Sequence, residues 1–153
     1  MMRGQRGAPD AVLFACTSNI VRSPMAAAML GHLAGGRISV ASAGVRAGGP
    51  DPYAMAVMDE IGIDISEHEP RILEDLGDAT FDLIITLSPE AHHHALELTR
   101  TMAVAVEYWP TLDAATLAGA GPREAVLNRY RLVRDGLFAR IIARFGLEGG
   151  PTV

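Results

Sequence analysis

A chain of 153 residues is long enough for one domain with a buried core, and 49% hydrophobic with 20% charged residues is a globular composition that argues against disorder. The formal net charge of −5 disfavours nucleic acid as the main partner, because phosphate backbones are bound by clustered Lys and Arg. The single cysteine excludes a disulfide within this sequence and a metal site of several thiolates, and it indicates a reducing compartment.

The first half of the chain alternates segments of strand and helix character. The apolar run Val12–Ala15 predicts a strand buried on both faces, and Ile38–Ala41 predicts a second strand. Between them, Pro24–Ala34 is rich in Ala, Met and Leu and is expected to form a helix that ends at the two following glycines. A helix is also expected over 51–62, capped by an aspartate that precedes a proline. Residues 71–76 are expected to form at most a short helix.

The second half of the chain repeats this alternation. Phe81–Leu87 predicts an apolar third strand, and Ser88-Pro89 predicts the start of a helix. A fourth strand is expected over 102–106, followed by a long irregular connection over 107–121, of a kind that often carries function. The last helix is predicted over 123–145, where apolar residues recur at helical spacing.

Strands that alternate with helices predict an α/β fold with a parallel sheet covered by helices on both faces. We place a single domain at 11–146, after a flexible N-terminus at 1–10 and before a C-terminal tail at 147–153. In such sheets, ligands bind at the carboxyl ends of the strands. Cys16 follows the first strand at this edge.

The segment Leu13–Cys16 is similar to a lipoprotein cleavage box, but Pro9 and Asp10 leave too short an apolar run for a secretion signal. No other run approaches the roughly 18 apolar residues of a membrane helix. We therefore expect a soluble, cytoplasmic protein.

The stretch from Cys16 to Ser23 combines groups that suit the binding and attack of an oxyanion. A loop that leads into a helix presents unpaired backbone N–H groups, and the helix dipole favours negative charge there. Arg22 adds a planar guanidinium that can clamp an oxyanion, and its charge favours the nucleophilic thiolate of Cys16. Ser23, and less clearly Thr17, can hydrogen-bond this thiolate. The Cys-x5-Arg spacing alone leaves open a buried structural cysteine beside a surface arginine.

The sequence of this loop, CTSNIVRSPMA from Cys16 to Ala26, resembles the phosphate-binding loop of the low-molecular-weight protein tyrosine phosphatases. Ser18 replaces a usual glycine, and Val21 replaces a cysteine that can protect the nucleophile as a disulfide. Thiol-linked arsenate reductases are close relatives with the same loop. Further similar pieces span nearly the whole chain, from Val12 to Phe145: Ser42-Ala43-Gly44, Gly62-Ile63-Asp64 with His68 and Arg71, Phe81–Leu87, and Trp109-Pro110 to Asp113.

The resemblance implies a three-layer domain of the phosphatase I type with a four-stranded parallel sheet. It also implies hydrolysis through a cysteinyl-phosphate, without a metal ion or another cofactor. Cys16 would attack phosphorus, Arg22 would hold the phosphoryl oxygens and Ser23 would stabilise the thiolate. The other residues of the loop would complete the phosphate-binding site: Thr17, Ser18, Asn19, Ile20 and Val21.

In the family, the asparagine that Asn19 matches has a left-handed backbone conformation that shapes the loop, and asparagine tolerates this conformation better than most residues. Ser23, Ser42 and His68 match residues that hydrogen-bond around it. For His68, an exposed loop histidine without such a role is the alternative.

A phosphatase also needs a general acid for the leaving oxygen and then a base for the attacking water. Asp113 matches the acid of the family, but Ala114 stands where the family usually has a proline that stiffens the loop. Ala115 and Thr116 replace the aromatic residues that usually follow and help to bind phosphotyrosine. These departures put the position of the acid in question.

We therefore predict a low-molecular-weight protein tyrosine phosphatase that hydrolyses phosphomonoesters. Its substrate would be a phosphorylated protein or a small aryl phosphate, with inorganic phosphate or a similar oxyanion as product or inhibitor. Neither nucleic acid nor membrane is expected as a partner, and the protein is expected to be a monomer or a weak dimer. One alternative is arsenate reduction with an external thiol, because reductases with an internal thiol relay use further cysteines. The other is a non-catalytic member that binds phosphate or a phosphorylated partner.

Three other groups of residues have alternative interpretations. The aromatic residues Tyr53, Tyr108 and Trp109 are candidates for walls of the substrate site or for core packing. The triplet His92–His94 is interpreted as a solvated helix start and not a metal site, because consecutive helical residues point about 100° apart. The arginines of the last helix are interpreted as a mostly solvated face: Arg129, Arg131, Arg134 and Arg140.

Overall fold

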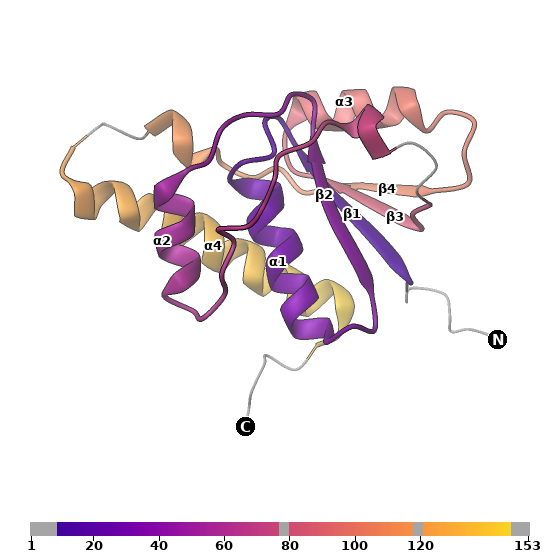
Figure 1. The fold of residues 1–153 in the computed structure, drawn as a ribbon. Helices are drawn as coiled ribbons and strands as arrows, with labels where there is room; N and C mark the ends of the chain where they lie inside the picture. Colours follow the sequence, from indigo (N-terminus) through magenta and orange to yellow (C-terminus); the bar gives the residue numbers. More distant parts are fainter. Residues whose placement is uncertain (1–8, 77–79, 118–120, 148–153) are drawn as a thin grey trace.

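The computed structural model describes residues 9–76, 80–117 and 121–147, and Figure 1 shows their arrangement. The elements in chain order are β1 (Ala11–Cys16), α1 (Arg22–Ala34), β2 (Ser39–Gly44), α2 (Pro52–Asp59), the 3-10 helix η1 (Leu73–Leu76), β3 (Leu83–Thr86), α3 (Pro89–Leu98), β4 (Ala105–Tyr108), the 3-10 helix η2 (Ala114–Leu117) and α4 (Arg123–Phe145). The expected N-terminus at 1–10 and tail at 147–153 lie almost entirely outside the described residues.

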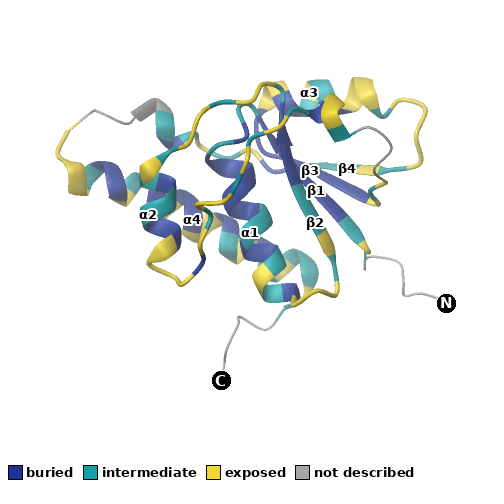
Figure 2. Ribbon diagram, viewed as in Figure 1, coloured by how far each residue is buried: buried dark blue, intermediate teal, exposed yellow. Residues whose placement is uncertain are grey.

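The four strands form one parallel sheet in the order β2-β1-β3-β4, which confirms the predicted architecture. Helices α1, α2 and α4 cover one face, and α3 with η1 covers the other (Figure 1). Alternate residues of β1 point to opposite layers: Val12 and Phe14 pack in the layer of α1 and α4, and Leu13 and Ala15 pack in that of α3. The two central strands, β1 and β3, are almost wholly buried (Figure 2).

Local sequence signals set the ends of the helices. Asp51 accepts two backbone hydrogen bonds at the start of α2, at 2.9 and 3.2 Å, and Ser88 accepts one from Ala91 at the start of α3, at 3.2 Å. α1 ends at Gly35, whose φ of 57° favours glycine. Among the described helices, none combines the length and the apolar character that crossing a bilayer requires.

The predicted fourth strand is displaced along the chain. β4 covers Ala105–Tyr108 and not 102–106, and Met102 is 53% exposed ahead of it. Glu107 lies inside the strand because β4 is at the edge of the sheet, where its carboxylate accepts a hydrogen bond from Arg144 Nε at 2.8 Å. The predicted strand ended at residue 106 because the prediction followed the apolar residues and stopped before this charged one.

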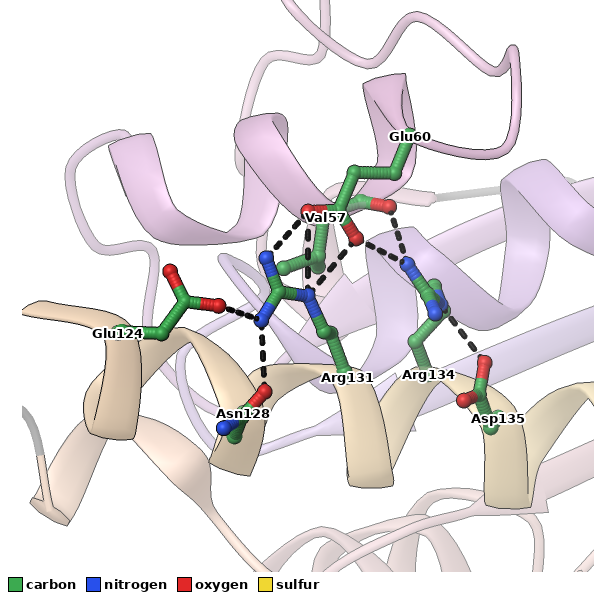
Figure 3. Close-up of polar contacts among 7 residues, drawn as sticks. All are labelled: Val57, Glu60, Glu124, Asn128, Arg131, Arg134 and Asp135. Atoms are coloured by element: carbon green, nitrogen blue, oxygen red, sulfur yellow. Dashed lines mark hydrogen bonds and ion pairs between the residues drawn. The ribbon is translucent and has the colours of Figure 1, made fainter.

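The interpretation of the α4 arginines as a solvated face is wrong for Arg134, which is only 8% exposed. Its Nη1 donates to the carbonyl oxygen of Val57 in the last turn of α2 and to Glu60, both at 2.8 Å. Arg131 donates to both carboxylate oxygens of Glu60, the shortest bond being 2.6 Å (Figure 3). The two arginines thus fasten the carboxyl end of α2, where cations are favoured, to the middle of α4.

We expect Glu60→Gln to lower the melting temperature at neutral pH, because the amide cannot pair with two guanidinium groups. Hydrogen bonds from Arg131 and then Arg134 lower the pKa of Glu60 from 4.5 to about 2. Because the folded-state pKa is the lower one, the stabilisation is present above about pH 4.5 and is lost as the pH falls towards 2. Thermal melts of wild type and variant should differ at neutral pH and converge in acid.

The matched control is Glu124→Gln, which removes a 71% exposed partner of Arg131 and should change the melting temperature less. A difference between wild type and Glu60→Gln that is the same at every pH would contradict this account.

Candidate active site

The predicted phosphate loop connects the carboxyl end of β1 to the start of α1, with Cys16 as the last residue of the strand. Three backbone hydrogen bonds continue the pairing of β1 and β2 into this loop. Val45 N donates to Cys16 O at 3.2 Å, Arg46 N donates to Thr17 O at 2.8 Å, and Gly48 N donates to Ser18 O at 2.9 Å. The segment after β2 therefore fixes the first half of the loop.

Cys16 is 2% exposed and faces the first turn of α1. Its Sγ lies 2.9 Å from Ser23 Oγ, and the backbone N–H of Ser23 donates to the same sulfur at 3.4 Å. The sulfur thus lies at a helix N-terminus, within hydrogen-bonding distance of one hydroxyl and one backbone N–H. The hydroxyl of Thr17, the other candidate partner of this sulfur, donates instead to Ser88 Oγ at 3.0 Å. Thr17 thereby connects the loop to the N-cap of α3.

Asn19 is fully buried and has a φ of 57°, the left-handed conformation that the resemblance implies. Its Nδ2 donates to Ser23 Oγ and to Ser42 Oγ, both at 2.9 Å. Its Oδ1 accepts from Arg71 N at 2.9 Å, and its backbone oxygen lies 2.8 Å from His68 Nε2. The structure thus brings Ser23, Ser42 and His68 together around Asn19. The hydrogen bond from Arg71 was not expected from the sequence, because it is donated by the backbone N–H and not by the side chain.

Gly44, at the end of β2, makes the closest backbone approach to the loop. A Cβ at this position would lie 2.6 Å from Arg46 O and 2.8 Å from Asn19 N, closer than real contacts allow. Glycine is required at position 44 because a side chain would have no room there, and not because of an unusual backbone conformation.

Arg22 is 7% exposed and reaches from the loop to the connection before α4. Its Nη1 donates to the carbonyl oxygen of Thr111 at 3.1 Å, and its Nη2 lies 3.5 Å from Asp113 Oδ2. The other carboxylate oxygen, Oδ1, accepts from Ala115 N at 3.1 Å. The carboxylate of Asp113 therefore lies beside the arginine of the loop even though alanine replaces the following proline.

Two of the three candidate aromatic residues pack elsewhere. Trp109 is 3% exposed and lies edge-on to Phe14 in the core, with ring centroids 6.1 Å apart. Tyr108 stacks on His92 at 4.6 Å. Of the three, Tyr53 remains as a candidate for the wall of a substrate site. It is partly buried, and its ring centroid lies 5.3 Å from that of Tyr130.

The histidine triplet is not a uniformly solvated helix start. His92 Nδ1 lies 2.8 Å from Thr86 Oγ1, and His94 Nε2 lies 2.7 Å from Glu74 Oε2, whereas His93 is exposed. The three side chains diverge. Within the described ranges, no group of three or more His, Cys, Asp or Glu is placed to hold a metal ion.

Within the phosphate loop, Val21 is buried in the core, and Ile20 and Ser18 lie against Gly48. The side chain of Thr116 lies outside the part that the structure describes. The site thus offers a thiol at a helix N-terminus and, within the same loop and the connection before α4, a guanidinium beside a carboxylate.

Comparison with known proteins agrees with this geometry. The family model of low molecular weight phosphotyrosine protein phosphatases matches residues 11–144. Arsenate reductase 1 of Staphylococcus epidermidis is 33% identical over 130 residues, which cover 85% of this chain and 91% of that protein. An arsenate reductase of Brevibacillus brevis is 39% identical over 130 residues, covering 85% and 90%.

Solved structures give the same result. An arsenate reductase in the phosphate binding state is similar with a TM-score of 0.68 and 26% identity, covering 90% of this chain and 97% of that one. The low molecular weight protein tyrosine phosphatase from T. tengcongensis is similar with a TM-score of 0.69 and 26% identity, covering 88% and 95%. With a family match over 134 contiguous residues that includes Cys16, Arg22 and Asp113, this chain belongs to the low molecular weight phosphotyrosine protein phosphatase family.

Proposed function

We propose that this protein hydrolyses phosphomonoesters, as a phosphatase that forms a cysteinyl-phosphate. The observation that carries the proposal is the placement of Arg22, whose guanidinium belongs to the loop of Cys16 and lies 3.5 Å from the carboxylate of Asp113. A nucleophile, an oxyanion clamp and an acid–base group are the minimum for this reaction.

In the first step, the thiolate of Cys16 attacks phosphorus while the bond from phosphorus to the leaving oxygen breaks. Protonated Asp113 gives its proton to that oxygen, so the alcohol or phenol leaves neutral. Arg22 and the backbone N–H groups of the loop bind the phosphoryl oxygens, on which charge is concentrated in the transition state.

In the second step, water attacks the cysteinyl-phosphate. The carboxylate of Asp113 takes a proton from the water, and the sulfur–phosphorus bond breaks to release phosphate. Ser23 supports this departure because its hydroxyl, 2.9 Å from Cys16 Sγ, and its N–H stabilise the thiolate that leaves.

For the substrate, we propose a phosphorylated protein or a small aryl phosphate. Tyr53, a partly buried aromatic residue in the first turn of α2, is the candidate that remains to contact an aryl group, since Trp109 is in the core. A reducing compartment such as the cytoplasm suits a catalytic thiolate.

Arsenate reduction is the second candidate, and the identity of 33% and 39% with proteins named arsenate reductases favours it. The reduction of As(V) to As(III) takes two electrons. Cys16 is the single cysteine of this sequence, so its thiolate would first displace hydroxide from arsenate to form a sulfur–arsenic bond. An external thiol would then attack the sulfur of Cys16, the sulfur–arsenic bond would break with its electron pair leaving on arsenite, and a mixed disulfide would remain.

Cys16→Ser should abolish hydrolysis, because a serine hydroxyl in this loop is a far weaker nucleophile than a thiolate. Steady-state turnover of p-nitrophenyl phosphate measures the effect, with glutathione-coupled reduction of arsenate measured in parallel on wild type. Turnover of the phosphate ester by wild type supports the phosphatase. Reduction of arsenate without ester hydrolysis supports the reductase, and tight vanadate binding with neither activity supports a non-catalytic binder. Full activity of Cys16→Ser would end the assignment of the nucleophile.

Asp113→Asn should lower kcat by about a hundredfold or more for esters with poor leaving groups, because these need a proton from the general acid. Esters with good leaving groups should be affected much less. Rates of phenyl phosphate and 2,4-dinitrophenyl phosphate hydrolysis compare the two cases. Equal rates for wild type and variant with both esters would move the acid role to another residue.

Gly44→Ala should weaken vanadate binding by about tenfold or more, because its methyl group would push apart Asn19 N and Arg46 O. Gly31→Ala in α1 is the matched control, since nothing lies within 4 Å of its added Cβ and alanine stabilises a helix by about 1 kcal/mol relative to glycine. Titration of both variants with vanadate, together with thermal melts, tests the comparison. Unchanged affinity of Gly44→Ala would show that the loop tolerates a side chain there.

A further inference from the structure

The segment that carries Asp113 is anchored to the sheet beyond the end of β4. Trp109 N donates to Thr86 O at 2.8 Å, and Thr111 N donates to Leu87 O at 3.0 Å, so two more bonds continue the parallel ladder with β3. Trp109 is also fixed by its burial in the core. The anchor ends at Thr111, two residues before the carboxylate.

Thr111 makes three hydrogen bonds in three directions. Its N–H binds the end of β3, as above. Its Oγ1 donates to Trp109 O at 2.8 Å and so bridges the backbone on the two sides of Pro110. Its carbonyl oxygen accepts from Arg22 Nη1 at 3.1 Å.

Side-chain packing fixes the two ends of this segment and not its middle. Trp109 is 3% exposed and Ala114 is fully buried, whereas Leu112 is 60% exposed. A groove of about 270 Å³ lies between residues 109–112 and α4, and Gly136, in its lining, has open space where a Cβ would be. Between its buried ends, the geometry of the segment therefore depends on its hydrogen bonds.

We propose that Thr111 is a positioning residue for the general acid. Its hydroxyl fixes the backbone around Pro110, this backbone directs the carbonyl oxygen of Thr111 at Arg22, and the guanidinium then lies against both Thr111 O and the carboxylate of Asp113. This arrangement takes over the stiffening that a proline at position 114 would give. The inference rests on the proposed phosphatase activity and assigns to it one more residue.

The variant Thr111→Val keeps the shape of the side chain and removes the hydroxyl. We expect kcat for phenyl phosphate, a poor leaving group, to fall about tenfold, the value of one hydrogen bond. The rate with 2,4-dinitrophenyl phosphate should fall much less, because that leaving group needs no proton from the acid. A loss shared by both esters and by the affinity for vanadate measures a shift of Arg22, and the excess loss with phenyl phosphate measures the shift of Asp113. The basic limb of the pH profile, which reports the acid, should shift or flatten.

Three further variants control for simple destabilisation. Thr111→Ser keeps the hydroxyl and should restore the wild-type leaving-group dependence. Ala114→Pro in the Thr111→Val background stiffens the loop at the first residue of η2, where proline is tolerated, and should recover part of the lost kcat. Thr99→Val removes a threonine hydroxyl that donates to Ala95 O at 2.8 Å in α3 and should leave both esters unaffected.

Amide hydrogen exchange gives a readout that does not depend on activity. Exchange at residues 111–115 should accelerate in Thr111→Val and not in Thr111→Ser or Thr99→Val. Unchanged exchange there, or equal losses of rate with both esters, would overturn the positioning role. A wild type that hydrolyses neither ester would overturn the proposed function instead, and the exchange data would still decide whether Thr111 orders the segment that carries Asp113.

Discussion

The side-chain amide of Asn19 is the contact on which the nucleophile loop depends. A left-handed conformation costs an ordinary residue about 1–2 kcal/mol, and it persists only where the surroundings over-determine it. Here both amide hydrogens and the amide oxygen have partners from three separate segments: the start of α1, the end of β2 and residue 71. Removing the amide would leave several buried polar groups unpaired, each at a cost of about 1–3 kcal/mol. The conformation of the loop is thus fixed by contacts within the protein, which is the pre-organisation that oxyanion binding needs.

Arg22 connects this loop to the segment that carries Asp113. Its backbone begins α1, while its guanidinium contacts Thr111 and Asp113 nearly a hundred residues later. The far end of that connection leads into α4, which the buried Arg134 and its neighbour Arg131 fasten to α2. A second link runs from Tyr130 of α4, whose hydroxyl donates to Asp51 at 2.7 Å. Burial, and then this hydrogen bond, raise the pKa of Tyr130, so the donor is retained at any physiological pH. The contacts that hold α2 to α4 and the connection that carries Asp113 therefore meet at α4.

The amino-acid sequence predicts what depends on neighbours along the chain. Asp51 before Pro52 and Ser88 before Pro89 are capping signals that act within three residues, and both helices start where expected. The resemblance to a family supplied the cluster around Asn19, which no local rule contains. The displaced β4 and the buried Arg134 had no such signal, because the ion pairs that permit them join residues 37 and 74 positions apart.

The role of Thr111 was hidden for a different reason. Its contact with Arg22 is made by a backbone carbonyl oxygen, and every residue has one. Composition and motif spacing describe side chains. A position that acts through its backbone is therefore recognised only once the conformation of that backbone is known. The same limit applies to Gly44, where what matters is the 2.8 Å approach to another backbone atom.

Similarity to arsenate reductases and to phosphatases is compatible with a single oxyanion cradle. Phosphate and arsenate have the same shape and nearly the same charge, so the loop, Arg22 and the helix N-terminus do not distinguish them. What separates the two reactions is the supply of electrons: hydrolysis needs none, whereas reduction needs two thiols. Val21, in the loop beside Arg22, is a buried aliphatic residue that can give no electrons to Cys16. The shared cradle is compatible with both reactions, and the lack of a second thiol in this sequence is the reason that we propose hydrolysis.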